Sequence, residues 1–311
     1  LKACRWDGPD DTARVTVTLR DLRTGEEEEL ETDALMLAVG HSARDTFAML
    51  DDAGVAMVRK PFAVGVRIEH AQHAIDEAQY GSSAGHPALP SADYKLAVHT
   101  SQERGVYTFC MCPGGQVVAA ASEAGGVCVN GMSDHARSGE NANSALLVEV
   151  RPDDFPLEEG VLAGVAFQRQ LEQAAYRVCG ETYAAPAQTV GDFLEGSKGG
   201  PLGSATYPRG VVEADLHEVL PAFVTEALEE ALPRLGRKLK GFNSPKAVMT
   251  AVEARSSSPV RIVRDKATLQ SVSHPGLYPV GEGAGYAGGI MSAACDGLRV
   301  AEAVIAAVAA S

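Results

Sequence analysis

The stretch that decides the fold lies near the C-terminus: the apolar run Leu277-Tyr-Pro-Val280 leads into Gly281-Glu-Gly-Ala-Gly-Tyr-Ala-Gly-Gly289, and a helical pattern then runs from Met291 to Ala310. Within it, Gly283-x-Gly285-x-x-Gly288 has the spacing of a turn that joins a strand to a helix and holds a pyrophosphate. Glycine lets the backbone approach an anion closely, and the free N–H groups of the helix start point toward that anion.

The position of this turn is unusual. A complete dinucleotide-binding unit continues to a second parallel strand, with an acidic residue about 20 positions on that holds a ribose. Here only one helix follows the turn. We therefore expect the turn to make a second, closing contact on a cofactor whose first contact is provided elsewhere.

Size and charge limit the classes of protein that fit. A chain of 311 residues is expected to form two structural units, and its hydrophobic content of 45% is normal for a globular protein. We expect no membrane span, because Asp296, Arg299 and Glu302 interrupt the apolar C-terminal helix. The net charge of −14 argues against nucleic acid as a partner. Six irregularly spaced cysteines do not suggest a disulfide framework, so a cytoplasmic location is expected.

The first fifty residues predict part of a sheet. Val15, Val17 and Leu19 alternate with polar residues, a turn follows at 23–25, and a strand resumes at 28–32, which together indicate a β-hairpin. The unbroken apolar run 34–40 is typical of a parallel strand buried on both faces, and a helix is expected over 45–50. We expect this strand and the one at 277–280 to lie in one sheet.

The middle of the chain, about residues 55 to 265, predicts a mixed α/β unit. Apolar patterns indicate strands and helices, and a segment rich in Gly, Pro and Ser indicates a long loop. The expected strands are 62–69, 106–111 and 116–122, the expected helices are 163–179 and 216–235, and the expected loop is 186–208.

Seven segments, in this order along the chain, match a family pattern: Lys60–His70, Phe109–Gly115, Asn130–Ser133, Gly139–Ser144, Ala185–Phe193, Glu253–Val260 and Gly281–Ile290. Together they resemble a largely uncharacterised group of bacterial FAD-dependent dehydrogenases within the glutathione-reductase-like flavoprotein class. The resemblance covers nearly the whole chain, but the N-terminal Gly-x-Gly-x-x-Gly and the ribose-binding acid of that family are missing. The chain therefore resembles the C-terminal portion.

The resemblance implies an α/β fold. A partial FAD-binding sheet is expected from both chain ends, residues 1–45 and 266–311, with a mixed α+β substrate domain inserted at 46–265. It implies an FAD-dependent oxidoreductase that transfers hydride between a small-molecule substrate and flavin N5. We expect the chain alone to hold FAD weakly or not at all and to be inactive. Its expected partners are the missing N-terminal part of the same protein and, through an exposed sheet edge, a second copy of itself.

Two glycine turns are the expected cofactor contacts. Pro113, Gly114 and Gly115 form a turn whose backbone could approach the flavin ring. For the turn at 281–289 the resemblance favours flavin contact, although a tight turn that binds nothing would share its pattern. Its expected contacts are Gly281, Glu282, Gly283, Gly285, Gly288, Gly289, Ile290 and Met291. Valine at Gly285 or Gly288 is expected to abolish FAD retention by blocking the approach of the backbone.

Arg255 is the candidate catalytic residue, because its guanidinium suits a substrate carboxylate or a flavin oxygen. The alternatives are a buried ion pair with Glu253 and a solvated surface charge. Cys110 and Cys112 suit either a redox dithiol or small buried residues on a strand, and no matching ligands predict a metal site.

Other polar residues allow two interpretations each. Arg67, Glu69 and His70 could supply a general acid or base, or could mark a solvent-facing strand end. Asn141 and Asn143 could bind a ligand or cap the following segment. His99 and His135 are expected to be structural.

Two other functions compete with the oxidoreductase. The chain could be a non-catalytic C-terminal module for binding or assembly, which the missing first glycine motif favours. It could also belong to an RNA-modifying flavoprotein, which its acidic charge disfavours.

Overall fold

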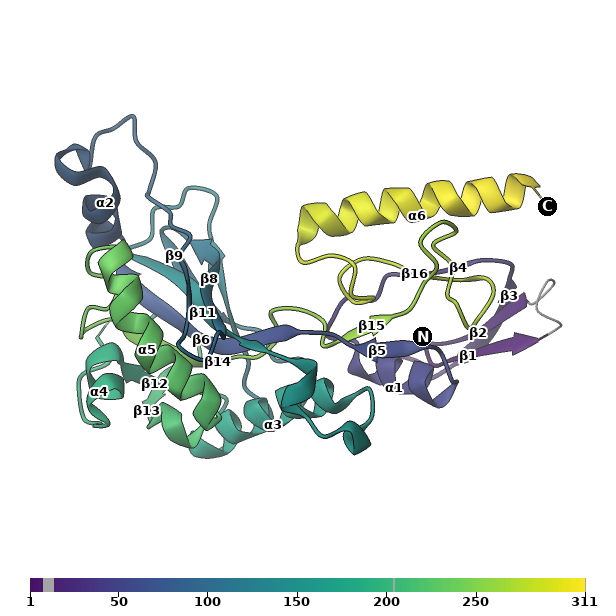
Figure 1. Cartoon of the computed structure of the whole chain (residues 1–311), viewed down its shortest axis with the longest axis horizontal. Coiled ribbons are helices and arrows are strands. Elements are labelled where there is room, and N and C mark those ends of the chain that lie inside the picture. Colours follow the sequence, from purple (N-terminus) through teal and green to yellow (C-terminus); the bar gives the residue numbers. More distant parts are fainter. Residues whose placement is uncertain (8–13, 204, 311) are drawn as a thin grey trace. The chain divides into compact units, whose positions relative to one another are not determined.

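The computed structural model describes residues 1–7, 14–203 and 205–310 (Figure 1). The chain forms two compact units. The outer unit contains both chain ends and comprises residues 1–62, 151–166 and 257–311, whereas the inner unit comprises 63–150 and 167–256. The outer unit is larger than the expected 1–45 and 266–311, because β5 (Met57–Arg59) pairs with β15 (Val260–Ile262) inside it. Its role in FAD binding stays a prediction.

An antiparallel sheet begins the outer unit. It consists of β1 (Ala3–Asp7), β2 (Arg14–Arg20) and β3 (Glu27–Thr32), in that order. The pairing of β2 with β3 confirms the expected hairpin. The Asp21 carboxylate accepts the backbone N–H of Arg23 at 2.7 Å, which stabilises the turn.

The expected pairing of the two apolar runs is also confirmed. β4 (Leu35–Leu37) and β16 (Leu277–Pro279) are parallel neighbours, with Leu35 opposite Leu277. The expectation that both faces of β4 are buried is wrong: Leu37 is 3% exposed, but Met36 is 40% exposed. Successive side chains point to opposite faces, and the apolar cluster around Leu37 and Leu277 covers one face only.

The two expected helices of the outer unit are present. α1 (Arg44–Asp52) buries Phe47 and Leu50, and α6 (Ile290–Ala310) packs through Val300 against Tyr278 and Val280. Short 3₁₀ turns at Pro152–Asp154 and Leu157–Glu159 complete this unit.

A seven-stranded mixed sheet forms the centre of the inner unit, in the order β13-β12-β14-β6-β11-β8-β7 (Figure 1). The strands are β6 (Phe62–Ala71, whose first residue lies in the outer unit), β7 (Ala97–His99), β8 (Gly105–Cys112), β11 (Asn141–Val150), β12 (Ala185–Thr189), β13 (Val211–Glu213) and β14 (Val248–Glu253). The hairpin of β9 (Gly115–Ala119) and β10 (Val129–Ser133) contacts β8, β11 and β14. The expected strands at 62–69, 106–111 and 116–122 correspond to β6, β8 and β9.

The remaining helices are α2 (Gln72–Tyr80), α3 (Ala163–Val178, which spans the boundary between the units), α4 (Val190–Glu195) and α5 (Ala222–Lys238), with 3₁₀ turns at Gly81–Ser83 and Leu216–Glu218. α3 confirms the expected helix at 163–179. Within the described residues, no helix combines the length and the apolar character that crossing a membrane requires.

Two local expectations are wrong. The segment 186–208 is not simply a loop, because it contributes to β12 and forms α4, where Thr189 caps the helix start and Gly196, in the left-handed conformation, ends the helix. The helix expected at 216–235 is interrupted: a 3₁₀ turn ends before Pro221, and α5 begins after it. Proline is tolerated at a helix start because the first N–H groups have no partner within the helix.

His217 links three of these elements. Its Nδ1 lies 2.8 Å from Asp215 Oδ1, its Nε2 lies 2.9 Å from Glu229 Oε1 on α5, and its ring stacks on Phe193 of α4. Burial alone lowers the pKa of His217, but the two carboxylates outweigh this effect and raise it. The protonated imidazole is therefore the form that the fold stabilises.

We predict that this contact stabilises the protein in acid. Because the folded pKa of His217 lies above the unfolded value of about 6.5, its contribution is fully present below that pH and is lost as pH rises through the folded pKa. His217→Gln should lower the free energy of unfolding by about 0.5–1 kcal/mol more at pH 5.5 than at pH 8.5, a small effect because the side chain is 31% exposed. Urea titrations at both pH values measure this, with His135→Gln at an exposed position as the control. If His217→Gln lowered the free energy of unfolding equally at the two pH values, protonated His217 would not be the stabilising form.

Candidate functional site

Two glycine turns meet in the outer unit, at the carboxyl ends of the parallel strands β4 and β16. Gly40, with φ +77°, follows β4, and residues 281–289 follow β16. The Cα of Gly283 lies so close to the Gly40 carbonyl that a Cβ at position 283 would collide with it. His41 Nε2, in the first turn, lies 3.6 Å from Glu282 Oε1 in the second. Ligands of parallel α/β sheets bind at this edge, so the two turns form the candidate cofactor site.

The glycines of the second turn have different roles. Gly285 has φ +85°, and a Cβ there would lie 2.8 Å from the Val260 carbonyl oxygen, so valine would disrupt the turn itself. Around Gly288 and Gly289, in contrast, no atom lies within 4 Å of an added Cβ in the described structure. That valine at Gly285 or Gly288 abolishes FAD retention stays a prediction, and at Gly285 disruption of the turn itself adds a second cause.

A buried ion pair, which the sequence did not reveal, fixes this turn to α6. Arg264 Nη2 donates to Asp296 Oδ1 at 2.6 Å, and Asp296 Oδ2 accepts the backbone N–H of Gly281 at 2.8 Å. The Arg264 guanidinium also lies 3.7 Å from the centre of the Tyr286 ring. Burial alone raises the pKa of Asp296, but Arg264 and the Gly281 N–H lower it. The sequence pattern alone presents Asp296 only as a charge that interrupts the terminal helix.

The start of α6 offers backbone donors next to the open glycines. Gly288 N–H donates to Ser292 Oγ at 3.3 Å, whereas no acceptor is found in the described structure for the N–H groups of Gly289, Ile290 and Met291. The side chains of Ile290 and Met291 are 88% and 75% exposed. Free N–H groups, the positive helix end and an open cradle fit the polar edge of a cofactor.

The predicted turn Pro113-Gly114-Gly115 lies in the inner unit, between β8 and β9. A Cβ at Gly114, which has φ +50°, would collide with the Arg137 carbonyl, so this glycine serves close packing of the chain on itself. Gly114 and Gly115 also line a cavity of about 300 Å³, together with Asn141 and Thr206. The approach of this turn to a flavin stays a prediction.

Arg255, also in the inner unit, is held by other side chains. Its Nε and Nη2 donate to the two Glu172 carboxylate oxygens, both at 2.7 Å, and its Nη1 donates to Ser122 Oγ. The side chains of Arg255 and Glu172 are 5% and 1% exposed. The alternative of a buried ion pair therefore describes this residue, but its partner is Glu172 and not Glu253. A catalytic role for Arg255 stays a prediction.

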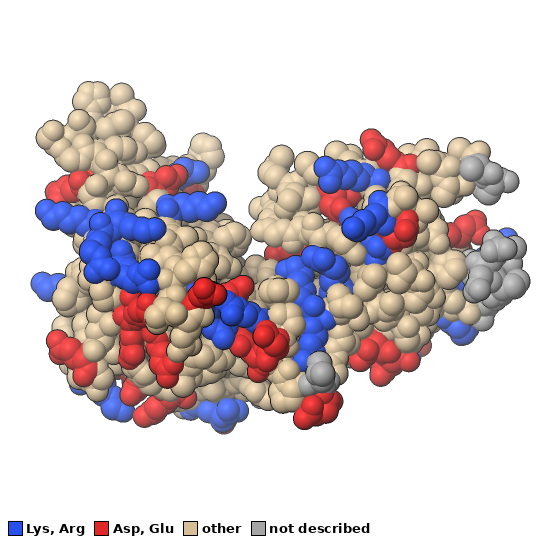
Figure 2. Space-filling view, in the orientation of Figure 1, with Lys and Arg blue, Asp and Glu red and all other residues tan. Residues whose placement is uncertain are grey.

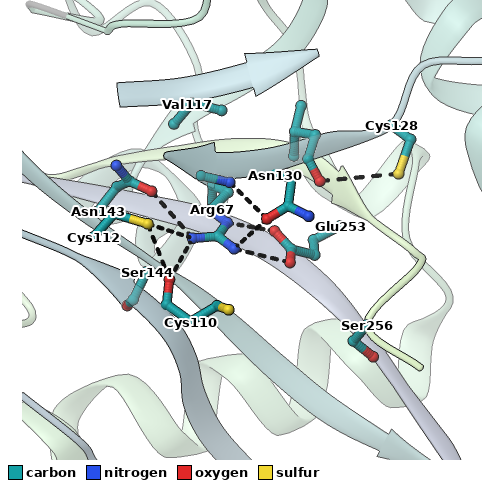
Figure 3. Close-up of polar contacts among 12 residues, drawn as sticks. Arg67, Cys110, Cys112, Val117, Cys128, Asn130, Asn143, Ser144, Glu253 and Ser256 are labelled. Carbon is teal, nitrogen blue, oxygen red and sulfur yellow. Dashed lines mark hydrogen bonds and ion pairs between the residues drawn. The ribbon is translucent and has the colours of Figure 1, made fainter. Parts of the chain in front are cut away.

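Glu253 instead pairs with Arg67, as Figure 3 shows. Arg67 is fully buried, and each of its guanidinium N–H groups has an acceptor. The acceptors are the Glu253 carboxylate, the Cys110 carbonyl, Asn143 Oδ1 and Asn130 Oδ1. Burial alone lowers the pKa of Arg67, but Glu253 outweighs this effect and raises it. The interpretation of residues 67–70 as a solvent-facing strand end is wrong, since Glu69 and His70 are also only 3% and 7% exposed.

The two cysteines beside Arg67 differ from each other. Cys110 is exposed and has φ +47° at an irregularity in the β8–β11 pairing, so the interpretation as a small buried residue is wrong for it. Cys112 is half-buried, and its thiol donates to the Cys110 carbonyl at 3.3 Å. Burial raises the pKa of Cys112, which Arg67 opposes. In the described part of the chain, no group of three or more His, Cys, Asp or Glu residues is placed to hold a metal ion.

Removal of the Arg67 side-chain charge should destabilise the protein strongly. Arg67→Met leaves the buried Glu253 carboxylate without its cation, which costs about 3–5 kcal/mol. The matched control is Arg169→Met, which breaks the half-exposed pair with Glu123 and should cost less than about 1 kcal/mol. Urea unfolding followed by circular dichroism compares the two. A similar decrease in the free energy of unfolding for both variants would show that burial does not make the Arg67 pair more important for stability than an exposed pair.

Comparisons with known proteins identify the family of the chain. Residues 61–256 match the model of a family described as "FAD-dependent protein, C-terminal domain-like". The chain is also 49% identical, over 281 residues, to a protein of Clostridium beijerinckii that is named an uncharacterized protein. The match covers 89% of this chain and 52% of the relative, so the chain spans about half the length of that relative. The chain belongs to the family of FAD-dependent proteins that this C-terminal domain-like model describes.

Proposed function

We propose that the chain is the C-terminal part of an FAD-dependent oxidoreductase that transfers hydride between a small-molecule substrate and flavin N5. The observation that carries this proposal is the meeting of two glycine turns at the carboxyl ends of β4 and β16, with Gly288 and Gly289 open before α6. Membership of an FAD-dependent family supports the identity of the cofactor.

In the proposed complex, the chain's own groups bind and orient the cofactor. The N–H groups of Gly289, Ile290 and Met291 would donate to the cofactor, and the positive end of α6 would stabilise negative charge on it. Asp296 and Arg264 keep the turn in place while these contacts form. When bound, FAD supplies the redox chemistry, and the protein supplies geometry and electrostatics.

We further propose that the first, pyrophosphate-binding contact lies in the part of the protein that corresponds to the other half of the relative. The outer unit offers apolar surface for such a partner. Met36 and Val39, on and just after β4, and Leu298, Ile305 and Val308 on α6 are 38–68% exposed. Much of the visible surface of α6 carries no charged side chain (Figure 2). The same surface would support self-association of the chain by itself.

Gly288 tests the proposal directly. In a protein that contains both this chain and the segment equivalent to the rest of the relative, Gly288→Val should abolish copurification of FAD. The backbone at Gly288 is not in the left-handed region, and an added Cβ meets nothing, so the fold should remain intact. Visible absorbance of the purified protein measures bound flavin, and circular dichroism checks folding.

Gly297→Val is the matched control, because it also adds a side chain where no atom lies within 4 Å in the described structure, but further along α6. It should leave the flavin content unchanged. If the Gly288 variant retained its flavin bands, the turn at 281–289 would not be a cofactor contact.

A further inference from the structure

A buried carboxylate in the inner unit has no cationic partner. The structure describes four acidic side chains that are buried: Glu69, Glu172, Glu253 and Asp296. The last three each pair with an arginine. No basic side chain in the described structure pairs with Glu69, which is 3% exposed and accepts hydrogen bonds from neutral groups alone: Asn141 Nδ2 at 3.2 Å, Thr206 N at 3.1 Å and Thr206 Oγ1 at 2.6 Å.

This carboxylate lines a cavity. The cavity has a volume of about 420 Å³, within the range of small-ligand sites, and its wall includes Glu69, His70, Asn141, Lys246 and Val248. Asn141 also lines the adjoining cavity near Gly114, where Asp134 and Glu140 add two more carboxylates. Burial of a charge without a counter-ion is unfavourable, so the cavity is electrostatically suited to a cation.

His70, the next residue of β6, supplies no counter-ion for Glu69. Its Nε2 lies 2.7 Å from the carbonyl oxygen of Phe242, which can only accept, so Nε2 carries the hydrogen. Its Nδ1 is buried, so a ligand in the cavity does not reach it. Burial lowers the pKa of His70, which keeps the imidazole neutral.

We propose that this cavity binds a small molecule that carries an ammonium group, with the Glu69 carboxylate as counter-ion. An ammonium group provides N–H donors and the positive charge that no described side chain supplies to Glu69. Lys246, which is exposed at the cavity wall, suits a negative group on the same ligand. The inference concerns ligand binding by the inner unit and does not depend on flavin binding.

Butylamine, butan-1-ol and butyrate test the proposal, because they share a carbon chain and differ in the charge of one end. Each is titrated into the 311-residue chain while the backbone ¹H–¹⁵N signals of Asn141, Thr206 and Val248 are followed. Butylamine should shift these signals, and the other two compounds should shift them far less. Equal shifts with butan-1-ol, stronger binding of butyrate, or no shift with butylamine would each overturn the proposal.

Two variants and a control locate the binding. Glu69→Gln keeps the size of the side chain but removes its charge, and it should weaken butylamine binding by about tenfold or more, the value of a charge-assisted hydrogen bond. Glu213→Gln, at an exposed position of β13, should have no effect. Ala74→Trp fills the cavity from an exposed wall position and should abolish binding even if the Glu69 variant does not fold. If a folded Glu69→Gln variant or the Ala74→Trp variant bound butylamine as tightly as the unchanged protein, the proposed site would be wrong.

Discussion

The parallel pairing of β4 with β16 is the contact on which the arrangement of this chain depends. It joins Leu35–Leu37 to Leu277–Pro279 and so connects the two ends of the sequence within one unit. Parallel strands cannot be joined by a tight turn, and here the connection contains the whole inner unit. Because the strands are parallel, both carboxyl ends lie at the same edge, and that edge carries both glycine turns.

Buried arginine–carboxylate pairs fix the conformation away from this edge. Arg67–Glu253 and Arg255–Glu172 lie in the inner unit, and Arg264–Asp296 lies in the outer unit. Each arginine is held at two or more positions of its planar guanidinium, so these pairs define geometry as well as neutralise charge. Glu69 is the contrast: its neutral donors satisfy its hydrogen bonds and leave its charge without a counter-ion in the described structure.

The sequence predicted those features that local patterns encode. The β2–β3 hairpin, α3 and α6 follow from periodicity over a few turns or strand positions, and the glycine turn follows from its spacing. β12 and α4 were missed, since Gly, Pro and Ser dominate their surroundings, and the break at Pro221 was hidden within a helical apolar pattern. The ion pairs could not be predicted, because their partners are far apart in the chain: Arg67 and Glu253 are separated by 186 residues. The sequence made Arg255 a candidate catalytic residue, which stays a prediction, and its partner Glu172 lies on α3, which no local pattern connects to it.

The glycine motif itself combines two physical roles that its spacing does not distinguish. Gly283 and Gly285 are required by the protein's own packing, against Gly40 and Val260, whereas Gly288 and Gly289 face open space. Asp296 accepts the N–H of Gly281 and so removes that donor from any ligand. The described N–H groups at the start of α6, at Gly289, Ile290 and Met291, are not used in this way, and the Arg264–Asp296 pair holds the preceding turn in position. A ligand that binds there finds its donors ordered in advance, and this reduces the entropy lost on binding.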